Sequence, residues 1–343
     1  MTRKLLIPFI CLSLAFIACS RISALPAFST KTLATPNATT VLSTRKPLKP
    51  VQTQSPTAYQ ASTTPTPVET GTAVPPSSTS TPDGPTPTLG PDDWKKMPVI
   101  PTGISQQVKL IYRLGLLNGN NPRAYSKVGD CNIILPYFVG DFDKPGAYDL
   151  GEYSSLQDTI DYFAGSHDRR SEAAKQGMTV SSIFSMLWVD QKECKASETP
   201  LTCELRVNRP MFAIISFGTN DAYSSVNFEK VMRRTIEITI GNGTVPILAT
   251  KADNAEHDYS INREIANLAY EYELPLWNFW AAVQPLPYHG MSVQFLEHLS
   301  AGTSIDTNFH FTGDNLKYGW TVRNLSALQM LNAMRIAVET ISK

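Results

Sequence analysis

The chain contains 343 residues, with 30 basic and 30 acidic side chains, 42% hydrophobic residues and 25 prolines. This balance excludes a wholly disordered or collagen-like chain, and without a basic excess we expect no nucleic-acid partner. The averages conceal two parts. Residues 21–90 hold 12 of the prolines and 25 Ser or Thr, whereas residues 91–343 carry 23 basic and 28 acidic side chains and are long enough for one large domain.

Residues 1–19 have the layout of an export signal. Arg3 and Lys4 precede an apolar run over residues 5–17 that is too short to span a bilayer as a mature helix. The sequence Phe16-Ile17-Ala18-Cys19 resembles the lipobox of bacterial lipoproteins, which implies that Cys19 carries lipid and becomes the mature N-terminus. Ordinary cleavage and secretion is the alternative. We therefore expect an extracytoplasmic protein, held at the bacterial cell surface by a lipid anchor in the membrane or else secreted.

Residues 20–92 are predicted to form a disordered linker. Their Ser/Thr/Pro-rich sequence offers almost nothing to bury in a core, and proline disfavours both helices and central strands. This composition also suits O-glycosylation. The folded domain is then expected over residues 93–343.

The cysteines fit an exported protein. Cys194 and Cys203 are separated by eight residues in a polar stretch, which favours a disulfide in an oxidising compartment. Metal ligation by this pair is the alternative, but no histidine lies nearby at a ligand-like spacing, and we expect no metal. Cys131 is then left over.

The domain alternates predicted strands and helices. A strand leads into Gly129, and further strands are predicted over residues 210–217, 245–250 and 274–279; helices are predicted over residues 156–163, 171–178, 228–240, 261–272 and 322–341. Such alternation indicates a three-layer α/β/α sandwich with a mainly parallel sheet. Ligands of such folds bind at the carboxyl ends of the strands.

Two short motifs follow predicted strands. Gly129-Asp130-Cys131 follows the first strand, and Gly218-Thr219-Asn220-Asp221 follows the buried run of residues 210–217. Together they resemble the first (Gly-Asp-Ser) and third (Gly-x-Asn-Asp) blocks of the SGNH, or GDSL-type, hydrolases, and the resemblance covers most of residues 120–340. It implies an α/β/α fold and hydrolysis of esters without a metal or organic cofactor.

The resemblance assigns roles to these residues. Cys131 stands at the position of the nucleophilic serine, and it is either a cysteine nucleophile, a relic of a lost serine or a small buried residue. Asn220 would donate to the oxyanion, together with a backbone N–H from Gly165 or, alternatively, Gly177. Asp130 and Asp221, inside the two motifs, are expected to belong to the binding site.

The catalytic histidine is less clear from the sequence. The family carries Asp-x-x-His near the C-terminal end, and His298 lies in the expected region, but Phe295 stands where the aspartate should be. His310 has Asp306 four residues before it and is the alternative. We favour His298.

The expected function is that of a surface-anchored hydrolase of acyl or acetyl esters, on lipid or envelope carbohydrate. The alternative is a catalytically degenerate relative that binds glycan or lipid. Asp253 and Asn254 follow the predicted strand of residues 245–250 and are expected to line the same rim.

Overall fold

The computed structural model describes residues 89–224, 226–295, 297–339 and 341. The predicted signal, Cys19 and most of the predicted linker lie outside the described residues. The first element, the 3-10 helix η1 (Asp93–Lys96), buries Trp94 and lies where the domain was expected to begin. Within the described ranges, no helix combines the length and apolar character needed to cross a membrane.

A four-stranded parallel sheet forms the centre of the domain. Its strands β1 (Asn121–Gly129), β2 (Pro210–Ser216), β3 (Val245–Ala249) and β4 (Leu276–Trp277) are neighbours in chain order. Every residue of β2 and β3 is buried, as the continuous apolar runs predicted. The α/β class and the parallel sheet are thus confirmed.

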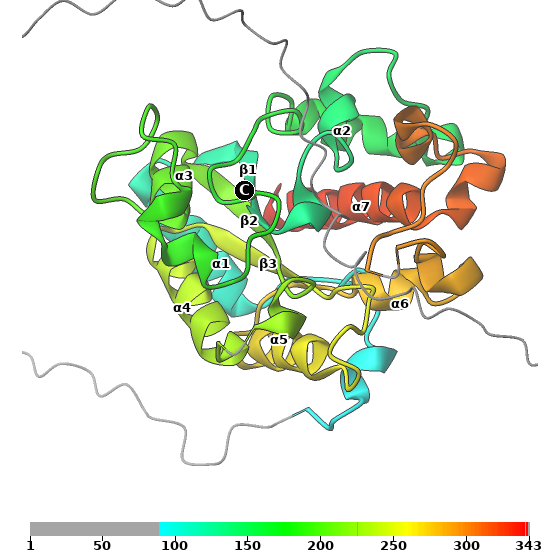
Figure 1. Ribbon diagram of the computed structural model, residues 1–343. Helices are drawn as coiled ribbons and strands as arrows, with labels where there is room; N and C mark the ends of the chain where they lie inside the picture. Colours follow the sequence, from blue (N-terminus) through cyan, green and yellow to red (C-terminus); the bar gives the residue numbers. More distant parts are fainter. Residues whose placement is uncertain (1–88, 225, 296, 340, 342–343) are drawn as a thin grey trace, which may run out of the picture. The chain divides into compact units, whose positions relative to one another are not determined.

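Helices lie on both sides of this sheet (Figure 1). On one side are α3 (Pro200–Asn208), α4 (Phe228–Gly241) and α5 (Ser260–Glu271), and on the other are α2 (Gln157–Tyr162) and the long α7 (Gly319–Glu339). The remaining helices are α1 (Gln106–Asn118), which precedes β1, and the short α6 (Phe279–Val283). Four of the five predicted helices are therefore present.

Residues 171–178 were predicted to be helical, and this prediction is wrong. The segment forms turns, and Ala174 makes a parallel bridge with Gly129 at the outer edge of β1. Gly129 donates its N–H to the carbonyl of Ala173 at 2.9 Å and accepts from the N–H of Lys175 at 3.3 Å. Because these backbone groups pair with β1, they are not available for a helical ladder.

The bridge at Ala174 shows that the chain crosses the sheet in opposite directions after β1 and after β2. After β1 the chain passes to this outer edge, whereas after β2 it passes the other way, to β3. The carboxyl ends of β1 and β2 therefore flank a topological switch point, the place where open α/β sheets form a ligand crevice. Both sequence motifs lie at this point.

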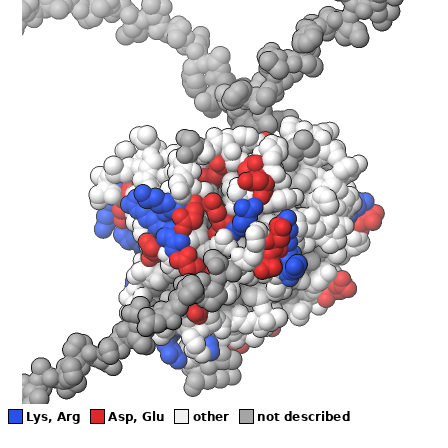
Figure 2. Space-filling view, turned by 90° about the horizontal axis from the view of Figure 1, so that it is seen from below, with Lys and Arg blue, Asp and Glu red and all other residues white. Residues whose placement is uncertain are grey.

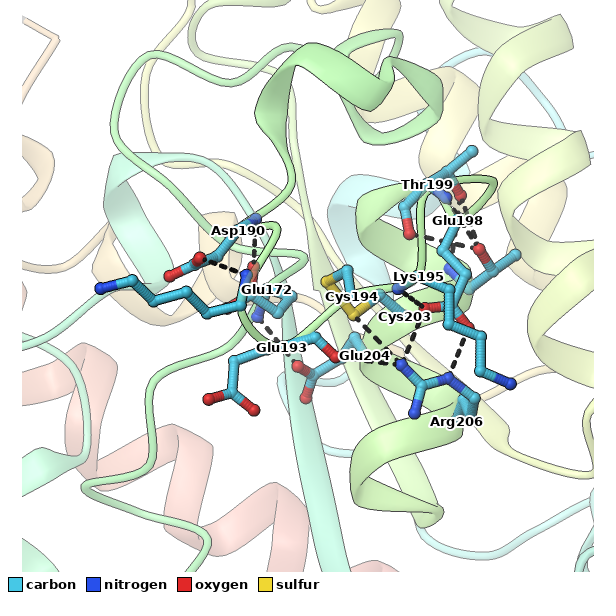
Figure 3. Close-up of a disulfide and its surroundings, with 12 residues drawn as sticks. Glu172, Asp190, Glu193, Cys194, Lys195, Glu198, Thr199, Cys203, Glu204 and Arg206 are labelled. Atoms are coloured by element: carbon cyan, nitrogen blue, oxygen red, sulfur yellow. Dashed lines mark hydrogen bonds and ion pairs between the residues drawn. A yellow bond between two sulfur atoms is a disulfide. The ribbon is translucent and has the colours of Figure 1, made fainter.

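The predicted disulfide is present. Cys194 and Cys203 are bonded, and the bridge fastens the loop before α3 to the helix itself (Figure 3). Arg206 of α3 pairs with Glu198 of the same loop. Although Cys194, Glu198 and Cys203 lie close enough together to surround a metal ion, the two sulfurs are bonded to each other and offer no thiolate ligand.

The surface of α4 and α5 carries mixed charges. Figure 2 shows basic and acidic side chains side by side on the face that is seen from below. Arg233 of α4 pairs with Glu229 and with Glu271 of α5, which joins the two helices. Exposed pairs of this kind stabilise a protein by at most about 1 kcal/mol each.

Candidate functional site

The two motif glycines allow the ends of β1 and β2 to approach closely. A Cβ atom on Gly129 would lie 2.0 Å from the carbonyl oxygen of Ser216 in β2. Gly218 has a φ of +132°, and a Cβ atom there would lie 2.8 Å from side-chain atoms of Ile261 and Lys251. Both positions therefore exclude larger residues, which explains the glycines of both motifs in terms of backbone packing.

Hydrogen bonds join the two motifs. Asp130 donates its N–H to the carbonyl of Ser216 at 3.2 Å, and its Oδ2 accepts from the N–H of Thr219 at 3.4 Å. The Nδ2 of Asn132 donates to Oγ1 of Thr219 at 3.0 Å. The turns that follow β1 and β2 thus form one polar structure, with Cys131 between the two residues that make these contacts.

Thr219 extends this structure to the end of β3. Its hydroxyl donates to Oδ2 of Asp253 at 2.7 Å, and Oδ1 of Asp253 accepts from the buried Nζ of Lys251 at 2.6 Å. Asp253 is therefore a buried member of the same polar structure. Asn254 does not contribute in the same way, because its Oδ1 closes a local turn by accepting from the N–H of Tyr259 at 2.9 Å.

Asp130, next to Cys131, is buried. Its Oδ1 accepts from the N–H of Asn132 at 2.9 Å and so caps the short 3-10 helix η2 (Cys131–Ile133). Burial raises the pKa of Asp130 to about 7. Asp130 therefore supports the turn through its hydrogen bonds, and its carboxyl group is not exposed at the surface to contact a ligand.

A buried arginine of α7 supports the same turn from the other side. Arg323 donates from Nε to the carbonyl of Asn132 at 2.6 Å and from Nη2 to Oγ of Ser216 at 2.8 Å. Its guanidinium lies over the rings of Trp277 and Phe279, at 4.9 and 4.6 Å from their centroids. Burial lowers the pKa of Arg323 to about 10, while the charges of Asp130 and Cys131 act in the opposite direction.

Asn220 and Asp221 fasten a second loop to the site. Asn220 donates from Nδ2 to the carbonyl of Met178 at 2.9 Å, and Oδ1 of Asp221 accepts from the N–H of Val180 at 2.9 Å. Oδ2 of Asp221 is buried and has no hydrogen-bond partner within the described ranges. Burial raises the pKa of Asp221 to about 6.

The structure distinguishes the two glycines considered for the oxyanion. Gly165 is exposed, and its N–H donates to Oδ1 of Asp143 at 2.8 Å, so this N–H already has a carboxylate partner. Gly177 directly precedes Met178, whose carbonyl accepts from Asn220. Gly177 rather than Gly165 therefore belongs to the loop that meets the second motif.

His298 lies in a segment that meets the turn of Cys131. A small cavity of about 10 Å³ is lined by the residues on both sides of Cys131 and on both sides of His298 (Asp130, Asn132, Glu297 and Leu299), together with residues at the carboxyl ends of β2 and β3. Phe295 packs against the imidazole, with ring centroids 6.0 Å apart. The neighbouring Glu297 accepts from the hydroxyl of Tyr223.

His310 occupies a different environment. It forms a parallel bridge with Asp149, and the next residue, Phe311, donates its N–H to the carbonyl of Asp149 at 2.7 Å. Asp306 is exposed, and within the described ranges it makes no hydrogen bond or ion pair with His310. Asp306 therefore does not orient the imidazole of His310 in this structure.

Sequence reasoning missed three residues of the site. Asn132 and Thr219 join the two motifs through a hydrogen bond. Thr219 was not expected to contribute, because it occupies the variable position of Gly-x-Asn-Asp. Arg323 lies in α7, far along the chain from the turn that it supports. The available signal for Arg323 was a basic residue within an apolar helical stretch.

No protein-family model matches the chain, and no curated protein matches it in sequence.

Proposed function

We propose that the chain is an SGNH-like acyl hydrolase that uses Cys131 to cleave acyl or acetyl esters of lipid or envelope carbohydrate. The observation that carries this proposal is the hydrogen-bonded union of the two motifs at the carboxyl ends of β1 and β2. A parallel strand order with a switch point beside Cys131 supports the corresponding three-layer α/β/α sandwich.

In the proposed reaction the sulfur of Cys131 attacks the carbonyl carbon of the ester. His298 accepts the thiol proton. Asn220 donates to the oxyanion of the tetrahedral intermediate through the second N–H of its amide, since the first is bonded to the carbonyl of Met178. When this intermediate collapses, the C–O bond breaks and the alcohol leaves with the proton from His298. Water then attacks the thioester, which releases the carboxylic acid and restores the thiol.

Arg323 supports this role for Cys131. Arg323 is buried and interacts electrostatically with Cys131. Its Nε also donates a hydrogen bond to the carbonyl of Asn132, the residue next to Cys131. A nearby cation favours the thiolate, which is the nucleophilic form of a cysteine.

The proposed location rests on the sequence. A lipid on Cys19 would anchor the domain to the membrane through the linker, and a disulfide between Cys194 and Cys203 is of the kind that persists outside the cytoplasm.

One observation favours the alternative, a non-catalytic protein that binds glycan or lipid. The ring of Phe295 packs on His298 at the sequence position where the family has its orienting aspartate. Loss of such a carboxylate lowers kcat by about 10⁴-fold in the serine-protease triad. We therefore expect a slow enzyme.

Hydrolysis of p-nitrophenyl acetate by the whole chain tests the proposal. Wild type should turn over the ester, and Cys131→Ala and His298→Ala should each abolish turnover, whereas His310→Ala should not. Hydrolysis retained by Cys131→Ser would show that the site is shaped for an oxygen nucleophile, and hydrolysis lost would show that it is shaped for sulfur. No turnover by wild type, combined with retained binding of glycan or lipid, would support the alternative instead.

A further inference from the structure

An open groove lies beside the nucleophile turn, along the outer edge of β1. Its volume is about 430 Å³, in the range typical of small-molecule sites. One wall is formed by residues 133–135, beside Cys131, and the other by residues 169–172 and 174–176. We call this the β1 groove.

Cationic side chains are concentrated in the β1 groove. Lys127, Arg169, Arg170 and Lys175 line it, against the acids Glu172 and Asp190. Lys127 is a buried lysine in the strand itself, and it donates to the carbonyls of His167 at 2.6 Å and Ser166 at 3.3 Å.

Ion pairs compensate only part of this charge. Lys175 pairs with Glu172 at 3.1 Å, and Arg169 pairs at 2.8 Å with Glu204, a fully buried residue of α3. Neither Lys127 nor the exposed Arg170 forms an ion pair with any residue that the structure describes. Arg170 is thus an exposed cation without an ion pair to the described residues, whereas the buried amine of Lys127 is bonded to two backbone carbonyls.

The far wall of the groove is held in place by the disulfide region. Asp190 donates its N–H to Glu172 at 3.3 Å, and Glu204 accepts from the N–H of Glu172 at 2.9 Å. Glu204 directly follows Cys203, so the disulfide and this wall belong to one anchored unit (Figure 3). A fixed wall of this kind suits a built binding site rather than a chance surface hollow.

We propose that the β1 groove binds an anionic group, carboxylate or phosphate, on the polymer that carries the ester, with Arg170 as the residue that selects it. This inference rests on the proposed function for its ester, but the binding itself does not depend on catalysis. Arginine suits the role because its planar guanidinium pairs with carboxylate or phosphate through two hydrogen bonds.

The protonation of Lys127 predicts that anion binding in the β1 groove depends on pH. Burial, and secondly the charge of Arg169, lower the pKa of Lys127 to about 7, while Glu204, Asp143 and Asp168 act in the opposite direction. A bound anion would stabilise the protonated amine. Affinity for an anionic polymer should therefore be higher below about pH 7 than above it.

Direct binding measurements on the whole chain test this inference. We would titrate polygalacturonate, a phosphorylated dextran and unmodified dextran by calorimetry. Wild type should bind one or both anionic polymers more tightly than dextran, and comparison of the two separates carboxylate from phosphate recognition. Arg170→Glu should weaken that binding by roughly 10-fold or more. The control Arg113→Glu reverses an exposed charge on α1 at a residue that does not line the groove, and should leave binding unchanged.

The outcomes separate the two proposals. Binding that depends on Arg170 without any ester hydrolysis would retain the β1 groove and overturn the proposed enzyme. Ester hydrolysis with no preference for either anionic polymer, or an Arg170→Glu variant that binds like Arg113→Glu, would overturn the groove and leave the enzyme standing.

Discussion

Replacing Asp130 with Asn should change how the stability of the domain depends on pH. The buried carboxyl of Asp130 has its pKa raised from 3.8 to about 7. A raised pKa means that the folded state holds the proton more tightly than the unfolded state does. The stabilisation is therefore complete below about pH 4 and is lost as the pH rises through about 7.

The size of this effect follows from the shift. About three pKa units at 1.36 kcal/mol each give a loss of about 4 kcal/mol between pH 4 and pH 7. Asp130→Asn removes the titrating group, but it also replaces the oxygen that accepts from Thr219, at a cost of about 1 kcal/mol at every pH. The variant should thus be slightly less stable than wild type in acid and more stable at neutral pH.

Urea unfolding of the whole chain across this pH range measures the difference. The exposed Asp306→Asn serves as the control and should follow wild type throughout. A difference between Asp130→Asn and wild type that stays constant within about 1 kcal/mol from pH 4 to pH 7 would refute the reasoning.

Three further predictions concern the disulfide, the oxyanion and the buried arginine. Replacing both Cys194 and Cys203 with Ser should lower the free energy of unfolding by about 3 kcal/mol, because the bridge restricts the conformations of the unfolded chain; equal urea midpoints would contradict this. Asn220→Ala should lower kcat for p-nitrophenyl acetate by about 10²–10³-fold, with Asn118→Ala as the control, and an unchanged kcat would remove Asn220 from the oxyanion site. Arg323→Lys should lower the free energy of unfolding by about 1–3 kcal/mol, because one of its two acceptors is left unpaired; a thermal scan with no shift would show that neither bond matters.

The sequence predicted those parts of the fold in which neighbouring residues carry the information. The apolar run of β2 and the periodic faces of α4 and α5 are local patterns, and all three elements formed where they were predicted. The helix α1 was missed because Leu110 and Leu117 lie exposed on it and blur its amphipathic pattern.

Non-local contacts explain what the sequence did not predict. The prediction of a helix over residues 171–178 is wrong because nothing in that segment's own sequence shows that Gly129 pairs with it. The same holds for the site. The motif residues are neighbours in the sequence and could be identified there, whereas Arg323, which bonds to the carbonyl of Asn132, lies 191 residues further along the chain. An arginine in a predicted helix is ordinarily assigned to the surface.

The most direct test of the account is a search for the covalent intermediate on Cys131. The whole chain would be mixed with p-nitrophenyl acetate, quenched in acid and digested, and the peptide that contains Cys131 would be analysed by mass spectrometry. We expect one acetyl group on Cys131 in wild type and little or none in His298→Ala, because the base that accepts the thiol proton is missing. Release of p-nitrophenol by wild type and Cys131→Ala at equal rates, with no acetyl group on the peptide, would contradict the account.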